Sequence, residues 1–349
     1  MQSSPPGWQF IDAEGTFRLK DPHLNSYLYF PLVNEAGLMS AITPTLNGDI
    51  KTGQNSFLTL PVSMEDLHNT RSARNFWVQV TGFPAWSITG NSAAQLAQQF
   101  TADNPEEATL EAGFLWHRLT RTNRELGLQA QITNFVPDTQ DQVELMQVSL
   151  SNLSDQPVQL TATAAIPIYG RSADDLRDHR HVTSLLHRIQ CSDFGVLVRP
   201  TLSFDERGHL PNRLTYAVLG TGGRGEKPAG FYPLVEEFIG EGGALDWPAA
   251  IIQNLPPGFQ AGQEYAGYES LGGVRFPQVT LQPGESTAFV LILAILEEGK
   301  DPQALVRAYG SQQLFEAHLQ KAQKAWQTRL NRFSIQTGDP RFDYWMRWV

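Results

Sequence analysis

The side chains best suited to chemistry gather between Asn34 and Trp86, where polar and aromatic residues are closely mixed. Planar groups that form two hydrogen bonds can hold neighbouring hydroxyls of a sugar, and aromatic faces can stack on the apolar side of its ring. The same residues could instead tie long loops together by hydrogen bonds, and composition alone supports both interpretations equally. The candidates for sugar contact are Asp49, Lys51, His68, Arg71, Arg74, Trp77 and Trp86.

A second concentration of titratable groups lies at 178–181, with His187 farther on. His179 and His181 would share one face of a strand, which is an arrangement that can hold a metal ion. However, Arg180 and Arg188 would add positive charge, and no Glu or Cys stands at a spacing typical of a metal site. We therefore interpret the histidines as polar rim or buried hydrogen-bonded residues and expect no metal.

Other motifs carry less weight. Residues 220–225 match G-x-G-x-x-G, but a dinucleotide site needs a helix to start there, and Pro228 and Pro233 follow instead. We expect a mobile loop at this position and no bound cofactor. No serine nucleophile motif is present, and Cys191 has no catalytic motif around it.

Adjacent carboxylates could suggest acid–base chemistry on a glycosidic bond. Such chemistry needs two carboxylates placed across a sugar in space, whereas neighbours on a strand point to opposite faces. We therefore interpret the adjacent pairs as solvated surface: Glu65-Asp66, Asp174-Asp175 and Glu236-Glu237.

The elements that must position these residues are mainly strands. Apolar and polar residues alternate through much of 110–300, most clearly at 126–133, 158–168 and 182–189. Small polar residues at 151–155 and 191–193 predict hairpin connections, and Pro283-Gly284-Glu285 opens an apolar strand. The pattern is typical of a mainly β, antiparallel sandwich over 1–300.

Helices are expected at 92–100 and after an N-cap at Asp301-Pro302, with a break at Gly310-Ser311. The last residues form an apolar helical stripe of Phe342, Trp345, Met346 and Val349. Such a stripe usually marks a partner surface, although it could fold back onto the sandwich.

Bulk properties restrict the function further. The chain has 349 residues and a net charge of −10, so nucleic acid and anionic membrane surfaces are poor partners. The longest apolar run, Ala288 to Leu296, is nine residues and predicts a buried strand. The start of the chain lacks the features of a signal peptide, and the single cysteine fits a reducing compartment, so we expect a cytoplasmic protein.

Several segments resemble one known family. They are Tyr29–Leu38, Gly48–Lys51, Ala73–Val78, Trp86–Thr89, Leu150–Asp155, Leu281–Glu285 and Trp326–Trp348. Together they are similar to the N-terminal domain of glycoside hydrolase family 94, which includes cellobiose phosphorylase. The Trp-Ser-x-Thr element at Trp86–Thr89 is the most specific of them.

The resemblance implies a galactose-mutarotase-like supersandwich over 1–300, followed at 301–349 by linker helices and the start of an (α/α)6 catalytic barrel. In that family the barrel carries the catalytic residues, so the resemblance implies none in this chain. It implies a homodimeric parent that cleaves a β-glucoside or β-linked oligosaccharide with phosphate. The alternative is a stand-alone sugar-binding or aldose-1-epimerase-like protein, in which His117, His179 or His181 could act with a carboxylate.

Overall fold

Strands with alternating inner and outer residues pair into two large antiparallel sheets that pack face to face. The structure, a computed structural model, describes residues 7–25, 27–63, 67–98, 101, 106–178, 180–205 and 207–349. In these residues the larger sheet has 11 strands, in the order β1 (Trp8–Phe10), β2 (Phe17–Lys20), β9 (Glu106–Gly113), β10 (Trp116–Asn123), β11 (Leu128–Phe135), β12 (Val143–Asn152), β23 (Ser286–Glu297), β18 (Leu214–Gly222), β15 (Gly195–Val198), β14 (Arg188–Cys191) and β20 (Glu264–Ala266).

Three smaller sheets complete the β structure of the described residues. The second large layer runs β19 (Gly230–Leu234), β21 (Ser270–Arg275), β13 (Val158–Ile168), β7 (Asn75–Val80) and β8 (Trp86–Ser87), with β22 (Val279–Leu281) paired to β13. A four-stranded sheet consists of β3 (Phe30–Val33), β4 (Met39–Ile42), β5 (Ile50–Gly53) and β6 (Ser56–Phe57). A two-stranded hairpin consists of β16 (Leu202–Asp205) and β17 (Gly208–Pro211).

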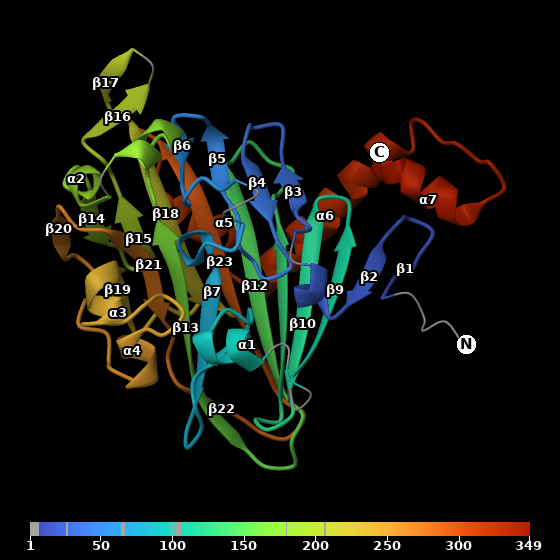
Figure 1. Cartoon of the computed structure of the whole chain (residues 1–349), viewed down its shortest axis with the longest axis horizontal. Helices are drawn as coiled ribbons and strands as arrows, with labels where there is room; N and C mark the ends of the chain where they lie inside the picture. Colours follow the sequence, from blue (N-terminus) through green and yellow to red (C-terminus); the bar gives the residue numbers. More distant parts are fainter. Residues whose placement is uncertain are drawn as a thin grey trace.

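Helices cover the outer faces of both large layers (Figure 1). The α-helices are α1 (Ala93–Gln98), α2 (Arg180–Ser184), α3 (Val235–Ile239), α4 (Ala249–Ile252), α5 (Pro302–Tyr309), α6 (Gln312–Leu330) and α7 (Pro340–Trp348). Three 3-10 helices are η1 (Pro22–Asn25), η2 (Thr70–Ser72) and η3 (Ala173–Arg177). In the described part of the chain, no helix is both long and apolar enough to cross a membrane.

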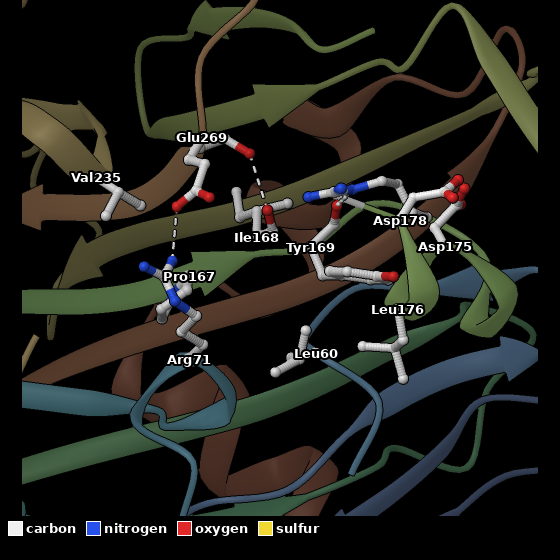
Figure 2. A pocket seen from close by; sticks show the side chains of 12 residues that line it. Leu60, Arg71, Pro167, Ile168, Tyr169, Asp175, Leu176, Asp178, Val235 and Glu269 are labelled. Carbon is white, nitrogen blue, oxygen red and sulfur yellow. Dashed lines mark hydrogen bonds and ion pairs between the residues drawn. The ribbon is translucent and has the colours of Figure 1, made fainter. Parts of the chain in front are cut away.

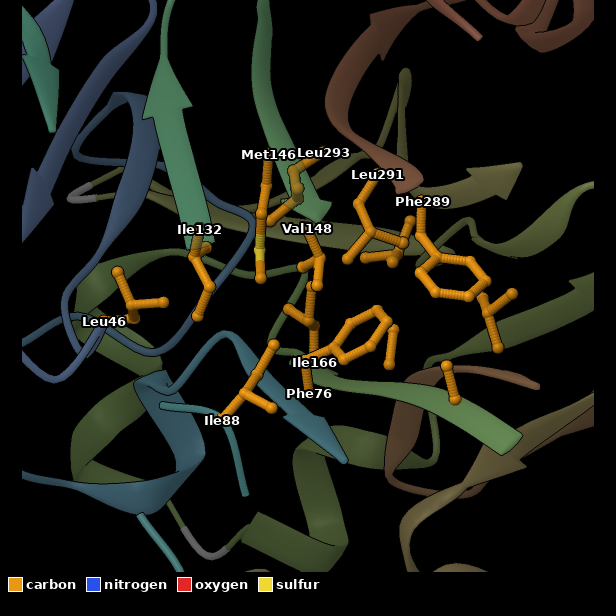
Figure 3. Close-up of a cluster of buried hydrophobic side chains, with 14 of the residues drawn as sticks. Leu46, Phe76, Ile88, Ile132, Met146, Val148, Ile166, Phe289, Leu291 and Leu293 are labelled. Atoms are coloured by element: carbon orange, nitrogen blue, oxygen red, sulfur yellow. The ribbon is translucent and has the colours of Figure 1, made fainter. Parts of the chain in front are cut away.

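The main core lies between the two large layers. Figure 3 shows Met146, Val148 and Leu291 of the larger sheet facing Phe76 and Ile166 of the smaller one. The alternate residues of the same strands, such as Leu145 and Ile292, pack beneath α5 and α6. The apolar run of β23 is therefore buried on both faces, which confirms the strand predicted there.

The predicted antiparallel sandwich and helix α5 are confirmed, and α5 begins with Asp301 accepting a hydrogen bond from the Gln303 N–H at 2.9 Å. Three local predictions are wrong. Residues 151–155 do not close a hairpin within one sheet, because β12 and β13 belong to different layers. Asn152 makes this crossing possible, since its side-chain amide donates to the carbonyls of Gln156 and Leu281.

The strand predicted over 182–189 is also wrong. Residues 180–184 form α2, and pairing begins only at Arg188. Val182 and Leu185 are 62% and 59% exposed, so the apolar positions of this stretch do not mark a buried strand face.

The glycine-rich segment at 220–225 is not the loop that the sequence predicts. Gly220 and Gly222 end strand β18 and pair with β23, and only a tight turn follows them. A Cβ at Gly220 would lie 3.0 Å from side-chain atoms of Leu291 and Phe276, so any larger residue would force these neighbours to move.

Candidate functional site

A pocket of about 100 Å³ opens where β13 ends and β21 begins (Figure 2). We call it the η3 pocket, because the 3-10 helix η3 forms one wall. Its polar lining comprises Arg71, Tyr169, Arg171, Asp175, Asp178, Glu269 and Ser270. Its apolar lining comprises Leu60, Pro167, Ile168, Leu176 and Val235.

The wall formed by η3 is held by a capping box. The Ser172 hydroxyl accepts a hydrogen bond from the Asp174 N–H at 3.3 Å, and the Asp175 carboxylate accepts one from the Ser172 N–H at 3.1 Å. A 3-10 helix has about three residues per turn, so Asp175 and Asp178 lie on the same side. Both face the pocket.

An ion pair closes the opposite side. Arg71 Nη1 lies 2.6 Å from Glu269 Oε2, and the Glu269 side chain is only 9% exposed. Arg71 belongs to η2, where Asn69 caps the helix by accepting the Arg71 N–H at 3.0 Å. Figure 2 shows Arg71 and Glu269 facing each other across the pocket from Asp175 and Asp178.

Tyr169 and Arg171 form the floor between these groups. The Arg171 guanidinium lies 4.5 Å from the centre of the Tyr169 ring, and its Nε donates to the Tyr169 carbonyl at 3.1 Å. Burial raises the pKa of the Tyr169 phenol, which donates to the Ser172 carbonyl at 3.0 Å. Burial also raises the pKa of Asp175, although the Ser172 N–H and the nearby Arg171 oppose this shift.

This arrangement suits a small, uncharged ligand rich in hydroxyl groups. Two guanidinium groups and three carboxylates nearly balance in charge, and both types form paired hydrogen bonds with vicinal hydroxyls. The apolar wall offers a surface for the C–H face of a sugar ring. No histidine is among the residues that line the pocket, so the described lining lacks an imidazole acid or base.

Of the seven residues predicted to contact sugar, the structure places one, Arg71, in this pocket. Asp49 directly precedes β5 and is only 5% exposed, and Lys51 lies on β5 with its Nζ 3.5 Å from the Asp49 carboxylate. His68 is exposed, with its ring centre 6.2 Å from that of Tyr27. Sugar contact by these four residues stays a prediction.

The other three candidates are buried and need correction. Arg74 is 0% exposed, and its Nε lies 2.6 Å from Glu144 Oε1. Its charge is therefore paired with a buried carboxylate inside the core. Trp77 is 1% exposed and packs in the layer beneath α3 and α4, and Trp86 is 3% exposed and donates to Glu106 at 3.0 Å. Their side chains have no surface left for a sugar, which supports the loop-tying interpretation at these positions.

Most residues that line the η3 pocket are not among the candidates predicted from the sequence. The pair Asp174-Asp175 was expected to be solvated surface, yet Asp175 is only 9% exposed because it caps η3 rather than lying on a strand. The pattern Ser-x-x-Asp at 172–175 is the signal that could have revealed this helix. Glu236 and Glu237 are exposed as expected, and Glu65-Asp66 lies outside the described residues.

Part of the histidine cluster, His179 and the side chain of His181, lies outside the described part of the chain. Within that part, no three His, Cys, Asp or Glu side chains gather closely enough to hold a metal ion. His187 is fully buried behind the pocket, where its Nδ1 lies 3.1 Å from the Ser270 hydroxyl.

Comparison with known families identifies the chain. Residues 85–312, well over half of it, match the family described as glycosyl hydrolase 94, supersandwich domain. The chain belongs to this family. The family resemblance drawn from the sequence is thereby confirmed, and no curated protein sequence gives a match.

Solved structures agree on the fold class. A bacterial glucoamylase complexed with acarbose is 8% identical with a TM-score of 0.50, and the match covers 88% of this chain and 37% of the glucoamylase chain. An aldose epimerase homologue from C. elegans is 12% identical with a TM-score of 0.41, covering 78% of this chain and 99% of its own. This chain therefore matches little more than a third of the glucoamylase chain. The mainly β supersandwich fold expected for it is confirmed by the family match and by the antiparallel sheets of the described residues.

Proposed function

We propose that this chain is the non-catalytic, sugar-handling part of a glycoside phosphorylase that cleaves a β-glucoside with phosphate. Membership of the glycosyl hydrolase 94 supersandwich family supports a sugar-handling role. The observation that supports the sugar-handling role is the lining of the η3 pocket, which has guanidinium, carboxylate and hydroxyl groups suited to hydroxyl recognition. The non-catalytic part of the proposal follows from the family resemblance, which places the catalytic residues in the barrel. We also propose that the protein is cytoplasmic. Its single, buried Cys191 and its negative net charge fit that compartment.

The alternative, an aldose-1-epimerase-like enzyme, is less well supported. That chemistry needs a histidine and a carboxylate over one sugar carbon. Of the three candidate histidines, His117 is 0% exposed, and burial lowers its pKa to about 3. His179 and the side chain of His181 lie outside the described residues. His117 is not among the described residues that line the η3 pocket, where Glu269 could supply the carboxylate.

The proposed partner is the catalytic (α/α)6 barrel, in a homodimeric parent. Helix α7 has two different faces. On one face Trp348 donates to the Gly15 carbonyl at 2.7 Å and stacks on Phe114 at 4.7 Å. On the other, Phe342 and Trp345 remain 43% and 51% exposed, which leaves an apolar surface for the barrel.

The first test is catalysis. We expect the isolated chain to release no glucose 1-phosphate from cellobiose, laminaribiose or sophorose, because the proton donor and phosphate site are proposed to lie in the barrel. An enzyme-coupled assay for glucose 1-phosphate measures this. Turnover that persists through repeated purification, and is lost on substitution of Glu269, would contradict the proposal.

The second test concerns α7. Substituting Phe342 and Trp345 by serine should reduce self-association and leave the melting temperature nearly unchanged, because exposed apolar groups contribute little to folding. Trp348→Ala is the matched control and should lower stability by about 2–4 kcal/mol, since it empties a packed aromatic site. Light scattering and thermal unfolding measure both effects. A large fall in melting temperature for the serine variant would show that this face is packed on the sandwich.

A further inference from the structure

An open trough of about 460 Å³ crosses the outer face of the larger sheet, at the end opposite α7 (Figure 1). Its lining comes from the neighbouring strands β18, β15, β14 and β20, and from residues that directly follow them. Four neighbouring strands span about 14 Å, which is the length of about four residues of extended chain. We call it the arginine trough, and its side chains on this face include Arg188, Gln190, Leu197, Arg199, Thr215 and Glu264.

The arginine trough lies on the solvent side of the sheet. Ile189, Val196 and Val198 point into the core between the two layers, so Arg188 and Arg199, which alternate with them, point outward. Helices α5 and α6 pack on the outer face of β12, β18 and β23. Both arginines are exposed beyond the part of the sheet that these helices cover.

The two arginines stand directly opposite each other on neighbouring strands. The Arg188 N–H donates to the Arg199 carbonyl at 3.1 Å, and the Arg199 N–H donates to the Arg188 carbonyl at 2.8 Å. The Cα atoms of such a pair are about 5.5 Å apart, and like charges at opposite positions destabilise a sheet. The chain therefore places two positive charges at an unfavourable spacing, although its net charge is −10. A bound anion would relieve the repulsion between them.

Each guanidinium group is oriented by uncharged acceptors. Arg188 Nη1 donates to the carbonyls of Leu185 and His187 at 3.0 and 2.9 Å, and Arg199 Nε donates to the Thr215 hydroxyl at 3.2 Å. Because Thr215 lies on β18, on the side of β15 away from β14, the two guanidinium groups diverge.

The remaining N–H groups form two separate forks. In the described part of the chain neither arginine forms an ion pair, and Arg188 Nε and Nη2 and Arg199 Nη1 and Nη2 have no hydrogen-bond partner. Each of these pairs of nitrogens matches the two oxygens of one carboxylate. The trough therefore offers two carboxylate sites on one face.

The spacing of the two forks indicates the kind of partner. Because the guanidinium groups diverge from positions about 5.5 Å apart, they suit two separate carboxylates better than one small anion. In an extended chain, residues i and i+2 lie on the same face about 7 Å apart. We propose that the arginine trough binds an extended acidic segment of a partner protein, with carboxylates at i and i+2 held by Arg188 and Arg199. This inference is independent of the sugar-handling function.

One negative group limits the site. Among the described residues that line the trough, Glu264 is the one carboxylate, and it accepts a hydrogen bond from Gln190 at 3.2 Å. Gln190 lies two residues from Arg188 on the same face of β14, so Glu264 is close enough to repel an acidic ligand. Removing its charge should therefore strengthen binding.

Fluorescence anisotropy with a rhodamine-labelled peptide of sequence Ser-Gly-Glu-Ser-Glu-Gly-Ser tests the inference. We expect this peptide to bind at least about tenfold more tightly than the same peptide with glutamine at both glutamate positions, because two charge-assisted pairs are lost. A peptide with two adjacent glutamates has the same charge and should bind about threefold more weakly, since adjacent side chains of an extended chain point to opposite faces. Added salt should weaken binding, because the site is exposed.

Variants of the chain locate the peptide. Arg188→Gln and Arg199→Gln should each weaken the acidic peptide about fivefold, whereas Glu264→Gln should strengthen it about twofold. Arg332→Gln, at an exposed side chain outside the trough, is the matched control and should have no effect. Thermal unfolding checks the fold, and neither trough arginine variant should lower the melting temperature, because each removes a like-charge repulsion.

Three results would overturn the inference. The first is equal binding of the glutamate and glutamine peptides, and the second is an equal loss of binding for Arg332→Gln and Arg199→Gln. The third is displacement of the labelled peptide by succinate at the concentration at which unlabelled peptide displaces it, because the trough would then take a free dianion rather than a protein segment. None of these results bears on the sugar-handling proposal.

Discussion

Glu144→Ala is expected to lower the free energy of unfolding by about 3–5 kcal/mol, because it leaves the charge of Arg74 buried without its partner. Both side chains are 0% exposed, and Arg74 Nε and Nη2 donate to the two Glu144 oxygens at 2.6 and 3.0 Å. Ser40 and Asn134 complete the network with hydrogen bonds of 2.6 and 3.0 Å to the same carboxylate. Urea unfolding at neutral pH measures the loss.

Two controls separate this effect from ordinary truncation. The double variant Arg74→Met with Glu144→Met should recover much of the loss, because apolar pairs of similar volume often replace buried ion pairs at little cost. Lys227→Ala removes the exposed partner of Asp193 and should cost less than about 1 kcal/mol. A loss for Glu144→Ala as small as that of Lys227→Ala would mean that the pair is solvated in the native protein.

The free energy of unfolding should begin to fall at a pH well above the range in which most carboxylates titrate. The pKa of His117 is lowered to about 3, mainly by burial and further by the nearby Arg74. The pKa of His187 is also lowered to about 3, mainly by burial and further by Arg171. In the unfolded chain both should titrate near 6.5, so below that pH the unfolded state binds more protons and stability falls. At pH 5 each histidine should cost about 2 kcal/mol relative to pH 7.5, or ~4 kcal/mol together.

Replacing both histidines by leucine should remove most of this pH dependence between 7.5 and 5. In the described structure neither ring nitrogen of His117 has a hydrogen-bond partner, so His117→Leu should also cost little at neutral pH. Free energies of unfolding from urea titrations across this range measure the slope, and an unchanged slope in the double variant would contradict the buried, neutral state of both rings.

The elements that could be predicted are those whose pattern follows from local burial. Strand β13 begins and ends at the residues expected from its alternation, and α5 begins at its expected cap. The strand prediction failed at 182–189, where the alternation of apolar and polar residues extends over only a few positions. Residues 180–184 form a helix, and the apolar Val182 and Leu185 are exposed and do not line a strand face.

Partner choice between strands could not be predicted in the same way. The residues at 151–155 are typical of a turn. Such a turn can precede a strand that pairs with β12, or a strand that crosses to another layer. Only the position of β23 beside β12 decides that β13 joins the second layer. The candidate site depends on such choices, because its lining comes from η2, the end of β13, η3 and the start of β21.

The sequence by itself determined that this is a mainly β, negatively charged family 94 chain with polar and aromatic residues suited to sugars. Those properties depend on composition, periodicity and short motifs, which are local. Tertiary structure alone decided which polar residues meet. Arg71 reaches Glu269, 198 positions away, whereas Arg74, three residues later, points into the core and binds Glu144. The direction in which each side chain points depends on the backbone conformation between them. Residue type therefore could not distinguish these two arginines. Only packing placed one in a pocket and the other in the core.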